Sequence, residues 1–259
     1  MRSDMGTKIV VAVVCSIAVI AISVTLYALG HVRLMAQLAG CEQNVKLIAL
    51  AFRLYADKEP RGYYPVLDPA QGRLAAKWDA VYPRYLTEPG ILTCPANEKA
   101  PVLPAAPAPN DIARAMDDHS YWYLGYALPN QERLLAFRDA YNRRVAEGGD
   151  FEGDLDDGHG APLLRLRQGV ERMFIPDGAE WTAGVLYAAS IPILVERPDN
   201  HKGGGHVLFL DGRIEFIPFP GKYPMTPEVV QALRSMDIVV LGGRTQPNPG
   251  NPSVPKALK

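Results

Sequence analysis

The sequence predicts an α+β protein in which a long N-terminal helix packs on an antiparallel sheet that includes a C-terminal β-hairpin. Three observations predict this fold class. The chain opens with an uncharged apolar run of 22 residues, 9–30; an amphipathic segment follows it to residue 59; and two strand-like runs flank Asp211 and Gly212. These three observations are explained by one helix, with its first part in lipid and its second part on a globular head, and by one sheet that the helix covers.

The first segment, residues 9–30, has the length and composition of a membrane-spanning helix. It contains no Asp, Glu, Lys or Arg, and at about 1.5 Å per residue it can cross a hydrocarbon layer of about 30 Å. In lipid, a helix satisfies its backbone polar groups internally. The alternative, a buried helix of a soluble core, is usually shorter and keeps a polar edge. We therefore expect residues 9–30 to contact the lipid bilayer, with residues 1–8 as a short flank.

The second segment, residues 31–59, predicts an amphipathic spine helix, because its apolar residues recur at alternating intervals of four and three. These positions are Leu34, Leu38, Cys41, Val45, Ile48, Phe52 and Tyr55. Pro60 and Gly62 then end the helix. We expect one continuous helix whose narrow apolar face packs on a globular head. Two separate helices with a bend at Gly30 or Gly40 are the alternative.

The N-terminus also allows two kinds of processing. Residues 38–41 read L-A-G-C, which has the form of a lipoprotein cleavage box and would make Cys41 an acylated first residue. A cleaved secretory signal is a further alternative, although its apolar core is usually about 7–15 residues. Basic residues stand on both sides of the span, Arg2 and Lys8 before it and Arg33 and Lys46 after it. Charge therefore does not decide the orientation.

The remaining chain, residues 60–244, is long enough for one globular head with its own core. Lys plus Arg total 27 and Asp plus Glu total 28, so the net charge of -1 offers no field for nucleic acid, and we expect no such partner. Proline-rich and acidic stretches predict insertions around 100–110 and 148–161, and residues 245–259 read as a flexible tail.

Three cysteines are too few for a disulfide scaffold. Cys15 falls inside the apolar run, so Cys41 and Cys94 are the only pair that can meet outside it. A disulfide between them is chemically allowed if the head is exported. Two buried thiols are the alternative.

The head contains one clear helix and one clear hairpin. Residues 130–147 have helical periodicity, with Asn130 as a suitable N-cap and Gly148-Gly149 as a C-terminal stop. Residues 191–196 and 205–210 read as neighbouring strands, with the second in the interior. The dipeptide Asp211-Gly212 predicts a two-residue type I′ turn. In the strand after it, we expect the face that carries Ile214 and Phe216 to be buried.

Two groups of residues suggest metal ligands. His201, His206 and Asp211 are a conceivable set, but their spacing is unlike a helical ligand pair. The other reading of His201 is structural: its ring would hold the loop at residues 203–205 by a hydrogen bond.

The second group is the acidic loop at residues 150–157. Asp154, Asp156 and Asp157 supply the oxygen ligands that Ca²⁺ takes, although the loop fails the EF-hand pattern. A solvated charged loop is the alternative. Ser120 and Ser190 have no evident His and Asp partners, so we expect no catalysis and no required cofactor.

Several motifs occur together in one order along the chain. His201, nine intervening residues and Asp211-Gly212 form an H-x9-D-G pattern. Residues 41–51, which include Cys41 and Asn44, read C-E-Q-N-V-K-L-I-A-L-A, and Cys94-Pro95 follows later. Residues 120–126 read S-Y-W-Y-L-G-Y, and residues 164–175 read L-R-L-R-Q-G-V-E-R-M-F-I. This ordered set resembles the prepilin-type processing-associated H-x9-D-G family of pilin-like and pseudopilin-like proteins.

The resemblance implies a pilin-like fold and a structural, non-catalytic subunit of a secretion or pilus-type assembly, related to type II secretion pseudopilins and type IV pilins. It implies one helix in the inner (cytoplasmic) membrane, an extracytoplasmic head, and other pilin-like subunits or assembly proteins as partners. The chain departs from a standard prepilin, because the residues after Gly6 lack the Glu at the fifth position. An anchored extracytoplasmic binding module, calcium-dependent through its acidic loop, is the alternative function.

Overall fold

This computed structural model describes residues 2–68, 74–97, 120–176, 182–201, 203–236, 238–241 and 244–247. The predicted insertion at 100–110 and the part of the predicted tail after residue 247 lie outside these ranges. By its internal contacts the chain divides into two units, residues 1–40 and 41–259.

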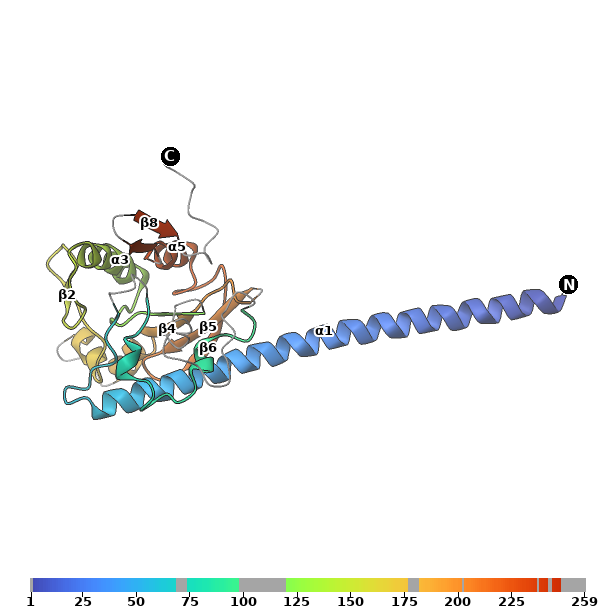
Figure 1. Ribbon diagram of the computed structural model, residues 1–259, viewed down its shortest axis with the longest axis horizontal. Helices are drawn as coiled ribbons and strands as arrows, with labels where there is room; N and C mark the ends of the chain where they lie inside the picture. Colours follow the sequence, from blue (N-terminus) through green and yellow to red (C-terminus); the bar gives the residue numbers. More distant parts are fainter. Residues whose placement is uncertain are drawn as a thin grey trace. The chain divides into compact units, whose positions relative to one another are not determined.

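A single helix, α1 (Arg2–Lys58), forms the N-terminal part of the chain (Figure 1). Its helical conformation runs through Gly30 and Gly40 without interruption, so the alternative of two separate helices is wrong. Past its end, Glu59 accepts hydrogen bonds from the backbone N–H groups of Arg61 and Tyr63 at 2.7 and 2.9 Å. These bonds turn the chain away from the helix axis directly after residue 58.

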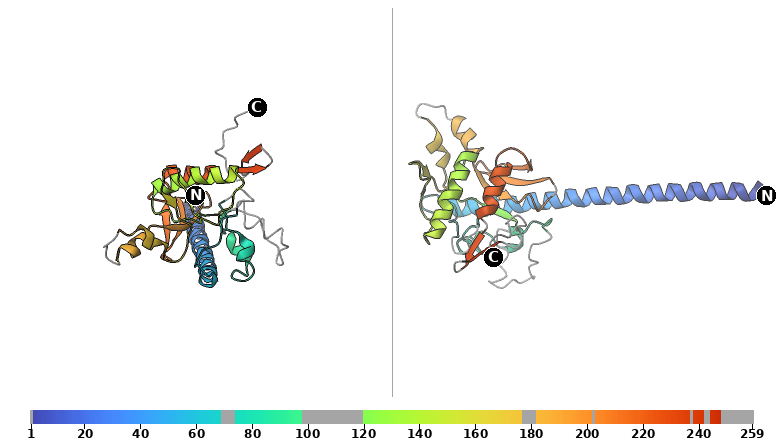
Figure 2. Two further views of the ribbon diagram at one scale, coloured as in Figure 1. Left: turned by 90° about the vertical axis from the view of Figure 1, so that its left-hand side faces the viewer. Right: turned by 90° about the horizontal axis from the view of Figure 1, so that it is seen from above.

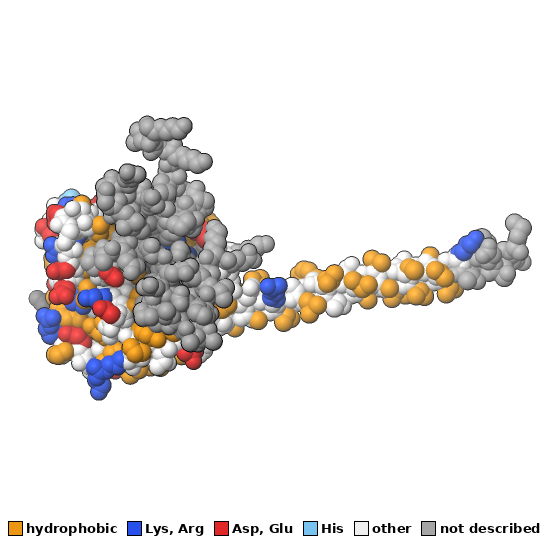
Figure 3. Space-filling model, in the orientation of Figure 1, with side chains coloured by type: hydrophobic (Ala, Val, Ile, Leu, Met, Phe, Trp, Pro, Cys, Tyr) orange, Lys and Arg blue, Asp and Glu red, His pale blue; other side chains and the backbone are white. Residues whose placement is uncertain are grey.

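In the first unit, α1 exposes its apolar side chains on every side. Val10, Ile20 and Leu26 are more than three-fifths exposed, and hydrophobic side chains cover the visible face of the helix in Figure 3. The hydroxyls of Ser16, Ser23 and Thr25 donate to the carbonyls four residues before them at 2.8–2.9 Å. Among the described residues, α1 is the one helix that is long and apolar enough to cross a membrane.

The second unit is built around a four-stranded antiparallel sheet with the strand order β1-β4-β5-β6 (Figure 1). The strands are β1 (Tyr121–Tyr123), β4 (Pro192–Glu196), β5 (Gly204–Phe209) and β6 (Ile214–Pro218). Every residue of β4 and β5 is buried. The prediction that the first hairpin strand lies in the sheet interior, beside the strand at 191–196, is confirmed.

The hairpin between β5 and β6 differs from its predicted geometry. Phe209 N–H donates to the Arg213 carbonyl, and Gly212 N–H donates to the Phe209 carbonyl, both at 2.9 Å. The loop therefore has three residues, with Gly212 at φ 88°, and the predicted two-residue type I′ turn is wrong. The predicted buried face of β6 is also wrong, because Ile217 is fully buried and Phe216 is 37% exposed.

Helices and short elements complete the head. The helix α3 (Gln131–Ala146) starts as predicted, since Asn130 Oδ1 accepts from Arg133 N–H at 2.9 Å, and it packs against α5 (Pro227–Met236) (Figure 2). The other elements are η2 (Trp78–Ala80), η3 (Pro89–Leu92), β2 (Leu155–Asp156), β3 (Pro162–Leu163), η4 (Val170–Phe174), α4 (Thr182–Ala188), β7 (Ile238–Leu241) and β8 (Arg244–Pro247). Residues 245–247 thus belong to a strand and not to a flexible tail.

The C-terminal half of α1 contributes one face to the core of the head. The buried residues on this face are Cys41, Val45, Ile48, Ala51, Phe52 and Ala56. The Phe52 ring lies 4.9 Å from that of Tyr123 on β1 and 5.9 Å from that of Trp78. The predicted apolar face is therefore confirmed from Cys41 onward, whereas Leu34 is 37% exposed.

Truncation of the buried face should destabilise the head strongly. We expect Phe52→Ala to lower the free energy of unfolding by about 3–5 kcal/mol, because it leaves a cavity beside two aromatic rings. The matched control is Leu54→Ala on the same helix, where the side chain is 41% exposed and the loss should stay below about 1 kcal/mol. Urea unfolding of the full-length chain in detergent micelles measures both. Equal losses would contradict the packing described here.

Candidate functional site

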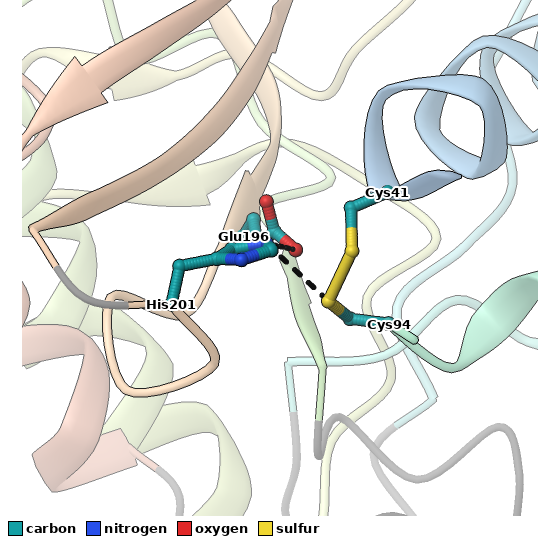
Figure 4. Close-up of side chains that lie close together, drawn as sticks. All are labelled: Cys41, Cys94, Glu196 and His201. Atoms are coloured by element: carbon teal, nitrogen blue, oxygen red, sulfur yellow. Dashed lines mark hydrogen bonds and ion pairs between the residues drawn. A yellow bond between two sulfur atoms is a disulfide. The ribbon is translucent and has the colours of Figure 1, made fainter. Parts of the chain in front are cut away.

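Four separate segments of the chain meet at a buried cluster of polar and sulfur-containing side chains. Cys41 comes from α1, Cys94 from the loop after η3, and Glu196 from the last position of β4. His201 lies in the turn between β4 and β5, and His206 lies on β5. Figure 4 shows four of these side chains converging. All five residues are at most 6% exposed.

Cys41 and Cys94 form a disulfide with a Cα–Cα distance of 5.2 Å. Of the two alternatives left open by the sequence, bridge or buried thiols, the structure forms the bridge. It joins α1 to the loop across a sequence separation of 53 residues. The Cys41 sulfur is thereby bonded to another cysteine inside the core, whereas acylation would need it as a free thiol. Cys15, the remaining cysteine, is exposed on the apolar run.

Hydrogen bonds hold the loop that carries Cys94 from both sides. Asn44 Nδ2 on α1 donates to the Thr93 carbonyl at 2.9 Å, and Cys94 N–H donates to Ser120 Oγ at 2.9 Å. Ser120 also accepts, through its carbonyl, from Asn200 Nδ2 at 2.8 Å. Asn44 and Cys94 belong to the predicted motifs, and Pro95 follows Cys94 directly. The hydrogen bonds of the Asn44 side chain and the Cys94 backbone together position the disulfide.

Glu196 is the centre of the cluster, and two histidines hold its carboxylate. Oε1 lies 2.9 Å from His201 Nε2, and Oε2 lies 2.7 Å from His206 Nδ1 and accepts from His206 N–H at 3.0 Å. Burial raises the pKa of the Glu196 carboxyl, but the hydrogen bonds from His201 and His206 outweigh it, so the pKa lies below its usual value. The carboxylate is thus ionised and buried.

His201 also contacts the disulfide, with its Nε2 3.4 Å from Cys94 Sγ (Figure 4). The ring therefore bonds Glu196 and the bridge, and the predicted ring hydrogen bond to the glycine loop is wrong. Only the backbone of His201 pairs with Gly204. Phe216 on β6 covers the two imidazoles edge-on, at centroid distances of 6.4 Å to His201 and 5.3 Å to His206.

Two glycines after His201 let β5 approach β4 and β6 closely. A Cβ on Gly205 would lie 2.7 Å from the Glu196 carbonyl oxygen, and one on Gly204 would lie 2.2 Å from the Ile217 carbonyl oxygen. Any side chain there would push β5 away from its neighbours. Glycine at both positions therefore keeps His206 within hydrogen-bonding distance of the Glu196 carboxylate.

The two halves of the H-x9-D-G pattern lie at opposite ends of β5. His201 precedes the strand, while Asp211 and Gly212 form the turn after it, about 20 Å away at the usual rise of a strand. Asp211 Oδ1 accepts from Arg213 N–H at 3.0 Å. A metal set of His201, His206 and Asp211 is therefore wrong, because the structure brings the two histidines together without the aspartate.

The acidic loop uses its carboxylates to organise its own backbone. Asp154 Oδ1 accepts from Arg165 N–H, and Asp156 Oδ1 accepts from Gly158 N–H, at 2.7 and 2.8 Å. Asp157 accepts from His159 N–H at 2.7 Å and forms an ion pair with Arg133 at 3.1 Å. The hydrogen bond from His159 N–H holds the pKa of Asp157 below its usual value. Calcium binding at these three aspartates stays a prediction.

Sequence reasoning missed Glu196, the central residue of the cluster. One signal was available: a charged side chain ends a strand that is otherwise apolar from residue 191. A carboxylate in a buried strand requires cationic or hydrogen-bonding partners. The two histidines that follow it within ten residues were the natural candidates.

Of the described residues, one group could hold a metal ion: Cys41, Cys94, Glu196 and His201 offer ligand atoms that all lie within 4.8 Å of one another. In the disulfide form the two sulfurs are bonded to each other, so this set becomes available only after reduction.

No protein-family model, no curated protein and no solved structure matches the chain.

Glu196→Gln should lower the free energy of unfolding at neutral pH by about 1–3 kcal/mol, because two buried imidazoles lose a charged acceptor. The pKa of Glu196 is lowered in the folded state, so its stabilising contribution is complete above the usual pKa of a glutamate, about 4.3, and is lost as the pH falls from there through the lower pKa of the folded state. The difference between wild type and variant should therefore narrow over that range.

Urea unfolding of the full-length chain in micelles at a series of pH values measures this difference. Glu88→Gln is the control, since Glu88 is exposed and its substitution should change stability little at any pH. A difference in the free energy of unfolding between wild type and Glu196→Gln that stays constant as the pH falls below the usual pKa of a glutamate, about 4.3, would show that the carboxylate is not ionised in the folded head.

Proposed function

We propose that this chain is a single-pass, membrane-anchored, pilin-like structural subunit of a secretion or pilus-type assembly, with its head outside the cytoplasm. The observation that carries the proposal is α1 itself. One helix combines a fully exposed apolar run with a C-terminal half that has one face buried in the head. A lipid span that continues into the spine of a globular head is the organisation of a pilin-like subunit.

The exposed apolar run supports the anchor. Its residues are apolar almost throughout, and none of this part of the helix is buried. Apolar side chains in such numbers are stable when they contact lipid or other helices in lipid. The three hydroxyls in this region donate to backbone carbonyls of the same helix, which removes the main cost of placing them in hydrocarbon.

The disulfide supports an extracytoplasmic head. Disulfides form and persist in oxidising compartments and are rare in the cytosol, where thiols are kept reduced. The Cys41–Cys94 bridge lies in the core of the head, close to the start of the buried half of α1. The bridge therefore supports a topology in which the membrane span precedes it and the head lies on the oxidising side of the inner membrane.

A second apolar face of α1 supports assembly with other subunits. Leu47, Leu50 and Leu54 follow one another at intervals of three and four and are 38%, 55% and 41% exposed. They lie on the helix opposite the residues that pack on the head. Intervals of this kind form an apolar stripe suited to another helix. The side chains around Glu196 are buried and bonded to one another, which fits a structural role better than catalysis.

The missing glutamate narrows the proposed role. The residues after Gly6 are Thr7, Lys8, Ile9, Val10 and Val11, so a carboxylate that would pair with the N-terminal amine of a neighbouring subunit is not present at the fifth position. The chain therefore fits a permanently anchored relative, or a minor or tip subunit, whose contacts run through the stripe on α1.

Crosslinking from the stripe tests the proposal. A photoreactive amino acid at Leu50 in the full-length chain, in its native membrane, should form adducts with a second membrane-anchored subunit. The matched position is Glu228, which is exposed at the start of α5 and should give few adducts. Mass spectrometry identifies the products. Adducts with lipid alone, or equal adducts from both positions, would contradict a structural assembly role.

A further inference from the structure

We propose that Cys41, Cys94, His201 and Glu196 form a binding site for a thiophilic divalent cation, foremost Zn²⁺, when the chain is reduced. The ion and the disulfide would then be alternative occupants of one place in the core. The inference does not depend on the proposed assembly role. It rests on the convergence of four ligand atoms, two sulfurs, one imidazole nitrogen and one carboxylate oxygen, within 4.8 Å of one another.

The donor set matches the chemistry of zinc. Zn²⁺ takes thiolate, imidazole and carboxylate ligands in tetrahedral sites, and two sulfurs with one nitrogen and one oxygen complete such a site. Structural zinc sites are usually closed to solvent, and all four residues are at most 6% exposed. Hard cations such as Ca²⁺ and Mg²⁺ prefer oxygen ligands, so this site would discriminate against them.

The distances are close to those of a tetrahedral site. With metal–ligand bonds of about 2.0–2.3 Å, the ligand atoms lie about 3.3–3.8 Å apart. His201 Nε2 lies 3.4 Å from Cys94 Sγ and 2.9 Å from Glu196 Oε1. The Cα–Cα distance of 5.2 Å between the cysteines leaves room for the two sulfurs to separate by side-chain rotation after reduction.

His206 supplies the support that metal ligands usually have. Its ring Nδ1 and its backbone N–H hold Glu196 Oε2 at 2.7 and 3.0 Å, which leaves Oε1 facing His201. Partners of this kind orient a ligand and tune its basicity. Two thiolates, one carboxylate and Zn²⁺ carry a net charge of −1, and the hydrogen bonds from His206 to Glu196 Oε2 stabilise that negative charge.

The exchange between the two forms balances. A dithiol reductant gives two electrons and two protons to the Cys41–Cys94 bond, which breaks into two thiols while the reductant becomes a disulfide. Zn²⁺ then replaces the two thiol protons, which leave to water. It also replaces the proton that His201 Nε2 donates to Glu196; that proton moves to Nδ1 of the same ring, and the lone pair of Nε2 binds the ion. In the reverse direction, a disulfide oxidant removes two electrons from the thiolates, and the ion is released.

Metal analysis of the full-length chain in micelles tests the site. The Cys15→Ser background leaves only the two cysteines of the cluster, and the chain is unfolded and reduced with dithiothreitol, then refolded without oxygen in the presence of Zn²⁺ or Co²⁺. We expect one ion per reduced chain, with sulfur-to-cobalt charge-transfer absorption, and none in the oxidised chain. Binding by the reduced chain no stronger than that of Cys41→Ser/Cys94→Ser would overturn the proposal.

Two variants assign the ligands. We expect His201→Asn to weaken zinc binding by more than about 100-fold and His206→Asn, which loses only support, by about 10- to 100-fold. His159→Asn, on the exposed acidic loop, is the control and should bind as the parent does. Parent-like binding by His201→Asn would show that the imidazole is not a ligand and would also overturn the site.

The rate of reoxidation of the parent chain, Cys15→Ser, tests the site without any substitution in the cluster, so the result does not depend on whether a variant folds. Reoxidation of the reduced Cys15→Ser chain by glutathione disulfide should slow at least about tenfold when Zn²⁺ holds the thiolates. The control is the same reaction with Mg²⁺, which should leave the rate unchanged. A rate that is the same with Zn²⁺ and Mg²⁺ would overturn the proposal.

Discussion

Burial of one face of α1 in the head is the interaction on which the rest of the structure depends. From Cys41 to Ala56 this face supplies core residues, and Phe52 contacts rings from β1 and η2. An isolated helix gains little stability from its own hydrogen bonds, so tertiary packing decides whether this half is fixed. The same helix carries the apolar run before Gly30. Because its second half is packed in the head, the apolar run can anchor the head to a membrane.

The cluster around Glu196 complements this packing with directional bonds. It joins α1, the loop at Cys94 and the two interior strands through one covalent bond and a set of short hydrogen bonds. A buried carboxylate without such partners would be strongly unfavourable. Hydrogen bonds from His201 and His206 stabilise the buried carboxylate. The carboxylate in turn fixes the orientation of both rings, and the His201 ring contacts the disulfide. The cluster thereby links the sheet to the helix in one arrangement.

Features that depend on neighbours along the chain could be predicted from the sequence. The helix and its apolar face, the Asn130 cap, and the pairing of β4, β5 and β6 all follow from periodicity and turn residues. Features that depend on contacts between distant segments could not. The Cys41–Cys94 bridge forms only because the loop at Cys94 meets α1, and the loop at Asp211 has three residues in the register that β5 takes with β6. The H-x9-D-G pattern is continuous in sequence, yet β5 separates its two ends.

Amide hydrogen exchange of the full-length chain in lipid nanodiscs tests the central claim most directly, that α1 is one helix whose first half lies in lipid and whose second half is held by the head. We expect slow exchange in residues 9–30 from burial in lipid, slow exchange from Cys41 to Lys58 that becomes faster in Phe52→Ala, and helical protection through Gly30 and Gly40. Fast exchange across residues 9–30, or protection after Cys41 that does not respond to Phe52→Ala, would contradict it.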